Sequence, residues 1–493
     1  MTAGVTNHVE ELPAELTPEV ACARLLDLSG VVLLESAAVS RRLGRWSFLC
    51  ADPFLTLRSK GRVVEEIDAA GARRYEGDPF EALDRLLAAY PREAVPGLPP
   101  FQGGAAGYLA YDLGQHLERV PAPRYDDLAL PDVVMGLYDC VVAWDHQTGR
   151  VTLLSTGLPA PDGPARAERA RARAEELRRR LATPAATLPL PAIPAEPPVS
   201  TAGAGVPGRY PVPGLPGVAS SFLVAEYLDA VARTREYILA GDIFQANLSQ
   251  RLEAPWREHP FALYRRLRSV NPAPFAAYVD AGGAVLVSAS PERFLRVEDG
   301  RVETRPIKGT APRGLTPMHD MALEQALRES EKDRAENVMI VDLLRNDLSR
   351  VCEDHSVDVT ELCAIERYPT VHHLVSTVTG RLQPGRGGVE LLRAAFPGGS
   401  ITGAPKVRAM EIIAELEPTR RSAYTGAIGY LGFDGAMDTS IVIRTFIVKE
   451  GTAYFQVGGG IVVGSDPERE YAETLAKAGG LLNALEARGG VAD

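Results

Sequence analysis

The sequence predicts an α+β fold with a large share of antiparallel sheet. From Ser220 onward, segments with helical periodicity alternate with short runs typical of strands. Glycine-containing turns separate these segments. The N-terminal part is also mixed, with strand-like runs beside an amphipathic helix.

The first region spans residues 18–157. Residues 31–34 are apolar and predict a short buried strand, and residues 80–90 place their leucines on one helical face. Residues 133–144 and 150–155 alternate like strands, joined by a turn at His146-Gln-Thr-Gly.

Residues 158–217 read as a connector rich in proline, alanine and arginine. Residues 165–181 favour a helix whose interleaved glutamates indicate a solvated face rather than an RNA contact. Proline, alanine and glycine dominate 183–217, which predicts an irregular, extended chain.

The remaining region, 218–487, holds the segments that predict most of the sheet. Helices are expected at 224–241, 260–271 and 319–344, with strands at 275–279, 284–288, 294–298, 440–448 and 453–457.

Composition limits the classes of function. The chain has 493 residues and a formal net charge of −11, which argues against a general nucleic-acid binder. No signal peptide or membrane-length apolar run is present. The five cysteines are scattered without a CxxC pair, so we expect a reduced, cytoplasmic protein.

Two segments present candidate catalytic side chains. The turn Ser290-Pro-Glu-Arg-Phe294 projects Glu292, as a general acid or as a carboxylate paired with Arg293. Pro306 and Gly309 bracket Lys308, which is either an exposed loop lysine or a nucleophile with a lowered pKa.

Carboxylates on two helical segments are candidate cation ligands. Residues 331–351 have a helical period that puts Glu336 on an apolar face, where a carboxylate needs a cation or a basic partner. In the second segment, with Asp466 as a possible N-cap, Glu470, Glu473 and Lys477 share one face. Surface ion pairing and Mg²⁺ binding are both open at this point.

Three further patterns concern ligand contacts. The run Gly398–Lys406 lacks the order of a phosphate loop, which argues against use of ATP. Glycines such as Gly458 and Gly460 allow a close approach to a ligand, or form a bulge. Arg444 interrupts a strand pattern, either as a carboxylate clamp or on a solvent face.

Together these motifs resemble the chorismate-utilising enzymes. The runs SPERF, RPIKGT, AENVMIVDLLRNDL, HHLVS, FPGGSITGAPK, AYTGAIGY, DTSIVIRT and VGGGIV follow one another in the family's order over residues 222–485. The N-terminal runs Leu33-Leu-Glu-Ser36 and Gly44-Arg-Trp-Ser47 also fit. The resemblance implies two opposed antiparallel sheets with outer helices, built from both regions entwined.

The resemblance also implies a reaction. Anthranilate synthases carry PIAGT where this chain has Pro306-Ile-Lys-Gly-Thr310, which matches the aminodeoxychorismate synthases. In that branch the lysine amine attacks C2 of chorismate and the 4-hydroxyl leaves. Ammonia then adds at C4 and displaces the lysine.

The resemblance assigns the other roles residue by residue. Glu292 and His373 match the catalytic pair near the ring, and Glu336 and Glu473 match Mg²⁺ ligands with Glu470 in support. The groups matched to substrate binding are Tyr424, Arg444, Gly458, Gly460 and Lys477.

A tryptophan site is implied in some members of the family. There, the serine of LLES cooperates with an NPSPY segment, which marks Ser36 and Asn271 as a candidate tryptophan site. Because Ala273 and Phe275 replace the serine and tyrosine of NPSPY, feedback inhibition is not expected, although binding of a structural tryptophan stays open.

The sequence contains no glutamine amidotransferase motif, so we expect ammonia from a separate amidotransferase subunit. Two other interpretations remain: an anthranilate synthase component I with an atypical lysine, and a chorismate-binding homologue without activity.

Overall fold

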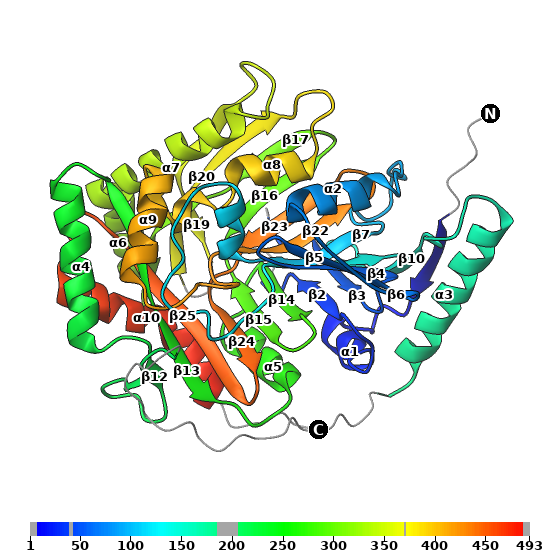
Figure 1. The fold of residues 1–493 in the computed structure, drawn as a ribbon, viewed down its shortest axis with the longest axis horizontal. Coiled ribbons are helices and arrows are strands. Elements are labelled where there is room, and N and C mark those ends of the chain that lie inside the picture. The colour runs from blue at the N-terminus through cyan, green and yellow to red at the C-terminus, as the bar shows by residue number, and fades with distance from the viewer. Residues whose placement is uncertain (1–6, 39–42, 185–205, 369–370, 487–493) are drawn as a thin grey trace.

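Two large antiparallel sheets form the centre of the computed structural model, which describes residues 7–38, 43–184, 206–368 and 371–486 (Figure 1). Residues 185–205 of the predicted connector at 158–217 lie outside the described residues. Every strand pair within the two sheets is antiparallel.

The first sheet has 13 strands in the order β1-β10-β9-β3-β2-β14-β15-β24-β25-β13-β12-β11, with β21 beside β13. Its strands are β1 (His8–Leu12), β2 (Val32–Glu35), β3 (Trp46–Cys50), β9 (Cys140–Asp145), β10 (Arg150–Ser155), β11 (Tyr210–Pro211), β12 (Ala219–Ser220), β13 (Gln245–Pro255), β14 (Phe275–Asp280), β15 (Val285–Ser290), β21 (Gly403–Ala404), β24 (Thr445–Lys449) and β25 (Thr452–Ile461).

The second sheet has 12 strands in the order β18-β20-β17-β16-β23-β22-β7-β8-β4-β5-β6, with β19 beside β20. Its strands are β4 (Leu55–Lys60), β5 (Val63–Asp68), β6 (Gly71–Glu76), β7 (Gly104–Leu109), β8 (Val133–Tyr138), β16 (Arg293–Glu298), β17 (Arg301–Thr304), β18 (Ile307–Pro312), β19 (Asp358–Arg367), β20 (Val371–Arg381), β22 (Ala427–Gly432) and β23 (Met437–Ile441).

The two sheets pack against each other through a shared apolar core. Phe48 of the first sheet meets Tyr430 of the second edge to face, with ring centroids 5.4 Å apart. Val32, Tyr108 and Val134 belong to the same buried cluster. This arrangement confirms the predicted fold of opposed antiparallel sheets.

Helices cover the outer faces (Figure 1). Helices α1, α3, α5 and α10 share a buried cluster with the first sheet, and α2, α7 and α8 share one with the second. The helical elements are α1 (Pro18–Ala23), α2 (Pro79–Ala88), η1 (Tyr111–His116), α3 (Pro164–Ala182), α4 (Val224–Leu239), α5 (Pro260–Val270), α6 (Pro317–Glu329), α7 (Glu331–Ser349), α8 (Gly388–Ala395), η2 (Gly399–Ile401), α9 (Lys406–Leu416) and α10 (Pro467–Glu486).

Two predicted strands were wrong because the chain changes sheet within them. Residues 133–144 form β8 in the second sheet and β9 in the first, with the break at Asp139. Residues 440–448 divide between β23 and β24, which also lie in different sheets. Both halves of each run are apolar, so the pattern alone carries no sign of the crossing.

The predicted helix at 319–344 was wrong in a related way, because it is two helices. Helix α6 ends at Glu329, and Ser330 caps α7 by accepting a hydrogen bond from the amide of Asp333. Serine favours this capping position, which explains the break.

Each sheet joins one block of strands from the N-terminal region to one block from the C-terminal region, so both regions build both sheets, as expected. In the first sheet β2 lies beside β14, and in the second β7 lies beside β22. The predicted boundaries of the regions stay a prediction. No helix among the described residues has the length and apolar character needed to span a membrane.

Candidate active site

Two crossings between the sheets lie side by side and carry predicted site residues. Glu292 lies in the crossing from β15 to β16, and Arg444 in the crossing from β23 to β24. The amide of Ile441 donates a hydrogen bond of 3.1 Å to the carbonyl of Glu292, which joins the two crossings.

Glu292 is a buried carboxyl group, 5% exposed. Burial raises its pKa to about 7, although a hydrogen bond from Ser400 and the charge of Lys308 act in the opposite direction. The Ser400 Oγ lies 2.6 Å from its Oε1. The alternative pairing with Arg293 is wrong, because that guanidinium binds Asp438 and Glu303 instead.

Lys308 lies on β18, where the pairing with β20 changes register between Ile307 and Thr310. The side chain is partly buried, not exposed. Burial and the charge of Lys477 lower its pKa, against the opposing effect of Glu336 and other carboxylates. Its amine makes no hydrogen bond or ion pair with the described part of the chain, so it is available to a ligand.

His373 lies on β20 opposite Thr310. Its Nδ1 and the Thr310 hydroxyl are 2.9 Å apart. Burial lowers its pKa to about 4, helped by the charge of Arg444. The imidazole is therefore neutral at physiological pH, and one ring nitrogen remains for a hydrogen bond with a ligand.

The predicted cation ligands come from two helices, Glu336 from α7 and Glu470 and Glu473 from α10. Burial raises the pKa of Glu336 on α7, where Lys308 and Lys332 act against it and Glu470 adds to it. Partial burial alone would raise the pKa of Glu473, but Lys477 at 2.7 Å and two other lysines lower it.

The donor set limits how a Mg²⁺ ion can bind. Nowhere in residues 7–38, 43–184, 206–368 and 371–486 do three acidic, histidine or cysteine side chains converge into a metal cage. Glu470 accepts a hydrogen bond from Ser465, and Glu473 is engaged by Lys477. The residues fit Mg²⁺ held by one or two carboxylates, with water and substrate oxygens completing the shell.

Gly458 and Gly460 lie on β25, along an edge that β24 leaves uncovered. β24 pairs with residues 452–455 only, whereas β13 pairs with the whole strand. Lys477 donates to the Gly458 carbonyl at 2.9 Å. A Cβ on Gly460 would fall 3.6 Å from the Lys308 amine, so glycine keeps space beside that lysine.

Gln245 shares this space, and sequence reasoning missed it. A Cβ on Gly460 would clash with its Nε2 at 2.1 Å, and its buried Oε1 has no hydrogen-bond partner among the residues described. Its place at the first position of a strand gave no signal. Ser400 was also missed, because neither the glycine-rich run around it nor the family motif that contains it indicates a role for its hydroxyl.

Arg444 is partly buried and adopts φ 53, so it lies at a bend and not within a strand, as the pattern had suggested. Burial lowers its pKa, with Tyr424 acting in the opposite direction. Burial also raises the pKa of Tyr424 to about 12, which keeps the phenol protonated. An arginine and a phenol donor together suit a carboxylate ligand.

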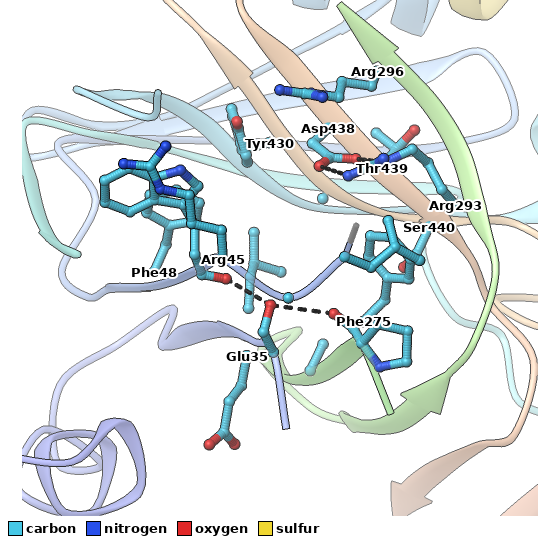
Figure 2. A pocket seen from close by; sticks show the side chains of 18 of the residues that line it. Glu35, Arg45, Phe48, Phe275, Arg293, Arg296, Tyr430, Asp438, Thr439 and Ser440 are labelled. Carbon is cyan, nitrogen blue, oxygen red and sulfur yellow. Dashed lines mark hydrogen bonds and ion pairs between the residues drawn. The ribbon is translucent and has the colours of Figure 1, made fainter. Parts of the chain in front are cut away.

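Of the two residues of the candidate tryptophan site, only Ser36 lines the separate cavity of about 250 Å³ between the sheets. Figure 2 labels Phe275 and Arg293 among the other residues that line this cavity. The Ser36 hydroxyl donates to the carbonyl of Trp46 at 2.7 Å. Asn271 is not among the lining residues but lies against Gly480 of α10. A ligand for this cavity stays a prediction.

Comparison with known proteins identifies the family. The family model for chorismate binding enzymes matches residues 44–483, most of the chain. The chain belongs to the chorismate-binding enzyme family. The substrate of this family is chorismate.

Relatives within the family divide between two reactions. Anthranilate synthase component 1 of Thermus thermophilus is 44% identical over 95% of both chains. Aminodeoxychorismate synthase component 1 of Salmonella typhimurium is 42% identical over 93% of this chain and 94% of its own. Overall identity therefore does not separate the two activities.

Solved structures agree with the fold. Anthranilate synthase component I from Streptococcus pneumoniae superposes with a TM-score of 0.75 and 32% identity, over 89% of this chain and 92% of its own. The menaquinone-specific isochorismate synthase from Escherichia coli superposes with a TM-score of 0.71 at 17% identity, over 98% of this chain and 95% of its own, which supports the fold alone.

Proposed function

We propose that this protein aminates chorismate at C4 to give 4-amino-4-deoxychorismate, as the synthase component of a glutamine-dependent enzyme. The observation that carries the proposal is Lys308. Its amine lies in the candidate active site, partly buried, with a lowered pKa. Burial that lowers the pKa of a lysine makes a larger share of it the free, nucleophilic amine at neutral pH.

The proposed chemistry uses Lys308 twice. Its Nζ forms a bond to C2 of chorismate, the two conjugated ring double bonds shift, and the C4–O bond breaks, so that the protonated hydroxyl leaves as water. Ammonia then forms a bond to C4, both double bonds shift back, and the C2–N bond to the lysine breaks. The net change is chorismate and ammonia to aminodeoxychorismate and water.

Glu292 would carry out the proton transfers. A carboxyl with a pKa of about 7 is present in both protonation states near neutral pH, so it can protonate the leaving hydroxyl and later accept a proton from the bound ammonia. The neutral imidazole of His373 can donate a hydrogen bond to the same hydroxyl.

Ammonia needs hydrogen-bond acceptors in such a site. The unpartnered Oε1 of Gln245, near Gly460 and the Lys308 amine, is a buried acceptor that suits an N–H donor. We assign this amide to the orientation of ammonia.

The remaining groups would hold the two carboxylates of chorismate. Arg444, Tyr424 and the Gly458–Gly460 edge suit the side-chain carboxylate. Mg²⁺ held by Glu336 with Glu473 or Glu470 would neutralise the ring carboxylate. Lys477 anchors this end of the site through the Gly458 carbonyl.

Ammonia would come from a glutamine amidotransferase subunit, because the relatives of both kinds are named as component 1. The same names support an alternative, anthranilate synthesis, in which ammonia adds at C2 without a lysine adduct.

A product assay tests the proposal. Purified protein is given chorismate, Mg²⁺ and concentrated ammonium at alkaline pH, with and without an aminodeoxychorismate lyase. We expect a non-fluorescent amine that only the lyase converts to 4-aminobenzoate. Fluorescent anthranilate without the lyase would contradict the proposal.

A further inference from the structure

Behind the candidate active site lies a fully buried ion pair, Glu417 with Arg421. Each residue is 2% exposed. Arg421 Nη2 lies 2.7 Å from Glu417 Oε1, and Nε lies 2.9 Å from Oε2. Burying two charges is costly unless nearly every polar atom is satisfied, so such a pair needs a reason beyond stability.

The pair ties together segments that supply site residues. Glu417 accepts hydrogen bonds from the amide and hydroxyl of Ser249, at 2.8 and 2.6 Å. Ser249 pairs with Gly458 across β13 and β25. Glu417 therefore holds β13, the strand that pairs with the glycine-containing strand β25.

Arg421, the other member of the ion pair, contacts two further segments that border the site. Its guanidinium donates to the carbonyl of Ile401 at 3.0 Å and to the carbonyl of Asn247. Ile401 follows Ser400, which holds Glu292. Asn247 lies across from Gly460.

The same guanidinium supports a strained segment. Arg421 Nη1 donates to the Thr425 hydroxyl at 3.2 Å, and Thr425 has φ 61, which a β-branched residue rarely adopts. The amide of Thr425 donates to the Val442 carbonyl at 2.7 Å, two residues before Arg444. Such a conformation persists only where its surroundings hold it.

Arg421 and Arg444 therefore differ in whether their guanidinium groups are already bound by the protein. The contacts of Arg421 to protein acceptors occupy its guanidinium. The guanidinium of Arg444 makes no hydrogen bond or ion pair with a residue in the described ranges. The Arg421 guanidinium also lies over the Tyr424 ring, 5.6 Å from its centroid.

We propose that Glu417 and Arg421 are positioning residues, which hold Tyr424, Arg444 and the Gly458–Gly460 edge in the geometry that binds a carboxylate of the substrate. The inference rests on the proposed function only for the identity of that substrate. Neither residue touches the reacting atoms.

The test uses Arg421→Lys, which keeps the charge opposite Glu417 but loses the planar fork of donors. We expect KM for chorismate to rise about tenfold or more, with kcat changed much less, because ground-state and transition-state binding are lost together. The pH profile of kcat should not move.

A matched control is Arg173→Lys. Arg173 on α3 also binds carboxylates, Asp52 at 2.9 Å and Asp139 at 3.5 Å, but lies outside the site. It should lower thermal stability and leave KM unchanged. If Arg421→Lys fails to fold, Thr425→Val removes only the hydroxyl that Arg421 contacts, and should raise KM in the same direction.

A double-mutant cycle with Arg444→Ala separates positioning from general destabilisation. Substitutions that act through the same site have non-additive effects on binding. Arg421→Lys should therefore raise KM little further in a protein that already carries Arg444→Ala. Additive effects, or an unchanged KM in folded Arg421→Lys and Thr425→Val, would overturn the inference. Product identity is read in the same assays, so anthranilate from the wild type would refute the proposed function and leave this comparison valid.

Discussion

The carboxyl group of Glu292 and the amine of Lys308 interact within one site, and burial moves the pKa of each towards neutrality. Opposite shifts of an acid and a base in one pocket are characteristic of groups that exchange protons or form bonds with a substrate. The residues were predictable from motifs, but their protonation states depend on burial that a sequence does not display.

The raised pKa of Glu292 predicts a cost in stability. Its folded pKa of about 7 exceeds the ordinary 4.5, so the folded state binds the proton more tightly. Stability therefore falls as pH rises from 4.5 to 7, by up to about 3 kcal/mol. Glu292→Gln should lose activity yet unfold at a higher temperature than the wild type at pH 8.

Calorimetric melting scans at pH 8 and pH 5 check this prediction. At pH 5 most of the wild-type carboxyl is already protonated, so the advantage of Glu292→Gln should shrink. An equal advantage at both pH values would show that packing, and not ionisation, is responsible.

The unpartnered amide oxygen of Gln245 predicts a selective defect when this residue is replaced. Gln245→Leu should raise KM for ammonia and leave KM for chorismate nearly unchanged, because only the acceptor for N–H is lost. Gln250→Leu on the same strand is the control, since its amide is already bound by Ser220 and Thr474. Initial rates measured against ammonium concentration test this prediction. Equal KM values for ammonia in the wild type, Gln245→Leu and Gln250→Leu would argue against this role.

At the scale of elements, the chain crosses between the two sheets at points that the hydrophobic periodicity did not predict. The strand patterns at 133–144 and 440–448 are continuous, yet each divides between two sheets. Arg444 owes its position to the second break, with its bend at φ 53. A sequence shows apolar alternation but not which sheet each half joins, because that choice depends on long-range pairing.

The helix break at Ser330 gives a test at this scale. Ser330→Ala removes the cap of α7 and should lower the free energy of unfolding by about 1 kcal/mol. Because α7 carries Glu336, the variant should also need more Mg²⁺ for half-maximal activity. Urea unfolding and a Mg²⁺ titration measure the two effects.

Thr316→Ala is the matched change at the start of α6, where the Thr316 hydroxyl accepts from the amide of His319 at 3.3 Å. Helix α6 carries no proposed site residue, so stability should fall by a similar amount without a change in Mg²⁺ requirement. A shift in both variants would mean that the α7 cap has no particular link to the cation.

At the scale of the whole molecule, the proposed site draws on both sheets and two outer helices. Lys308 and His373 come from the second sheet, Gly458 from the first, and Glu336 and Glu473 from α7 and α10. The family resemblance predicted both the fold and this set of residues. Composition and periodicity alone left a purely structural role open for each of these residues. Their convergence in one site is a property of the tertiary structure, which the sequence pattern does not display.

A site of this kind predicts how nitrogen must be supplied. With ammonium salts, activity should rise towards alkaline pH, where more free ammonia is present. Glutamine should support turnover only after an amidotransferase subunit is added. Turnover of glutamine by this chain alone, measured as glutamate release, would contradict the assignment of a separate nitrogen source.

The most direct test of the central claim compares the products of the wild type and Lys308→Ala under identical conditions. Chorismate, Mg²⁺ and ammonia are supplied, and mass spectrometry with added lyase resolves 4-aminobenzoate from anthranilate. The account predicts lyase-dependent 4-aminobenzoate from the wild type and essentially none from Lys308→Ala, although that variant should still bind chorismate. Anthranilate from the wild type, or undiminished 4-aminobenzoate from Lys308→Ala, would contradict it.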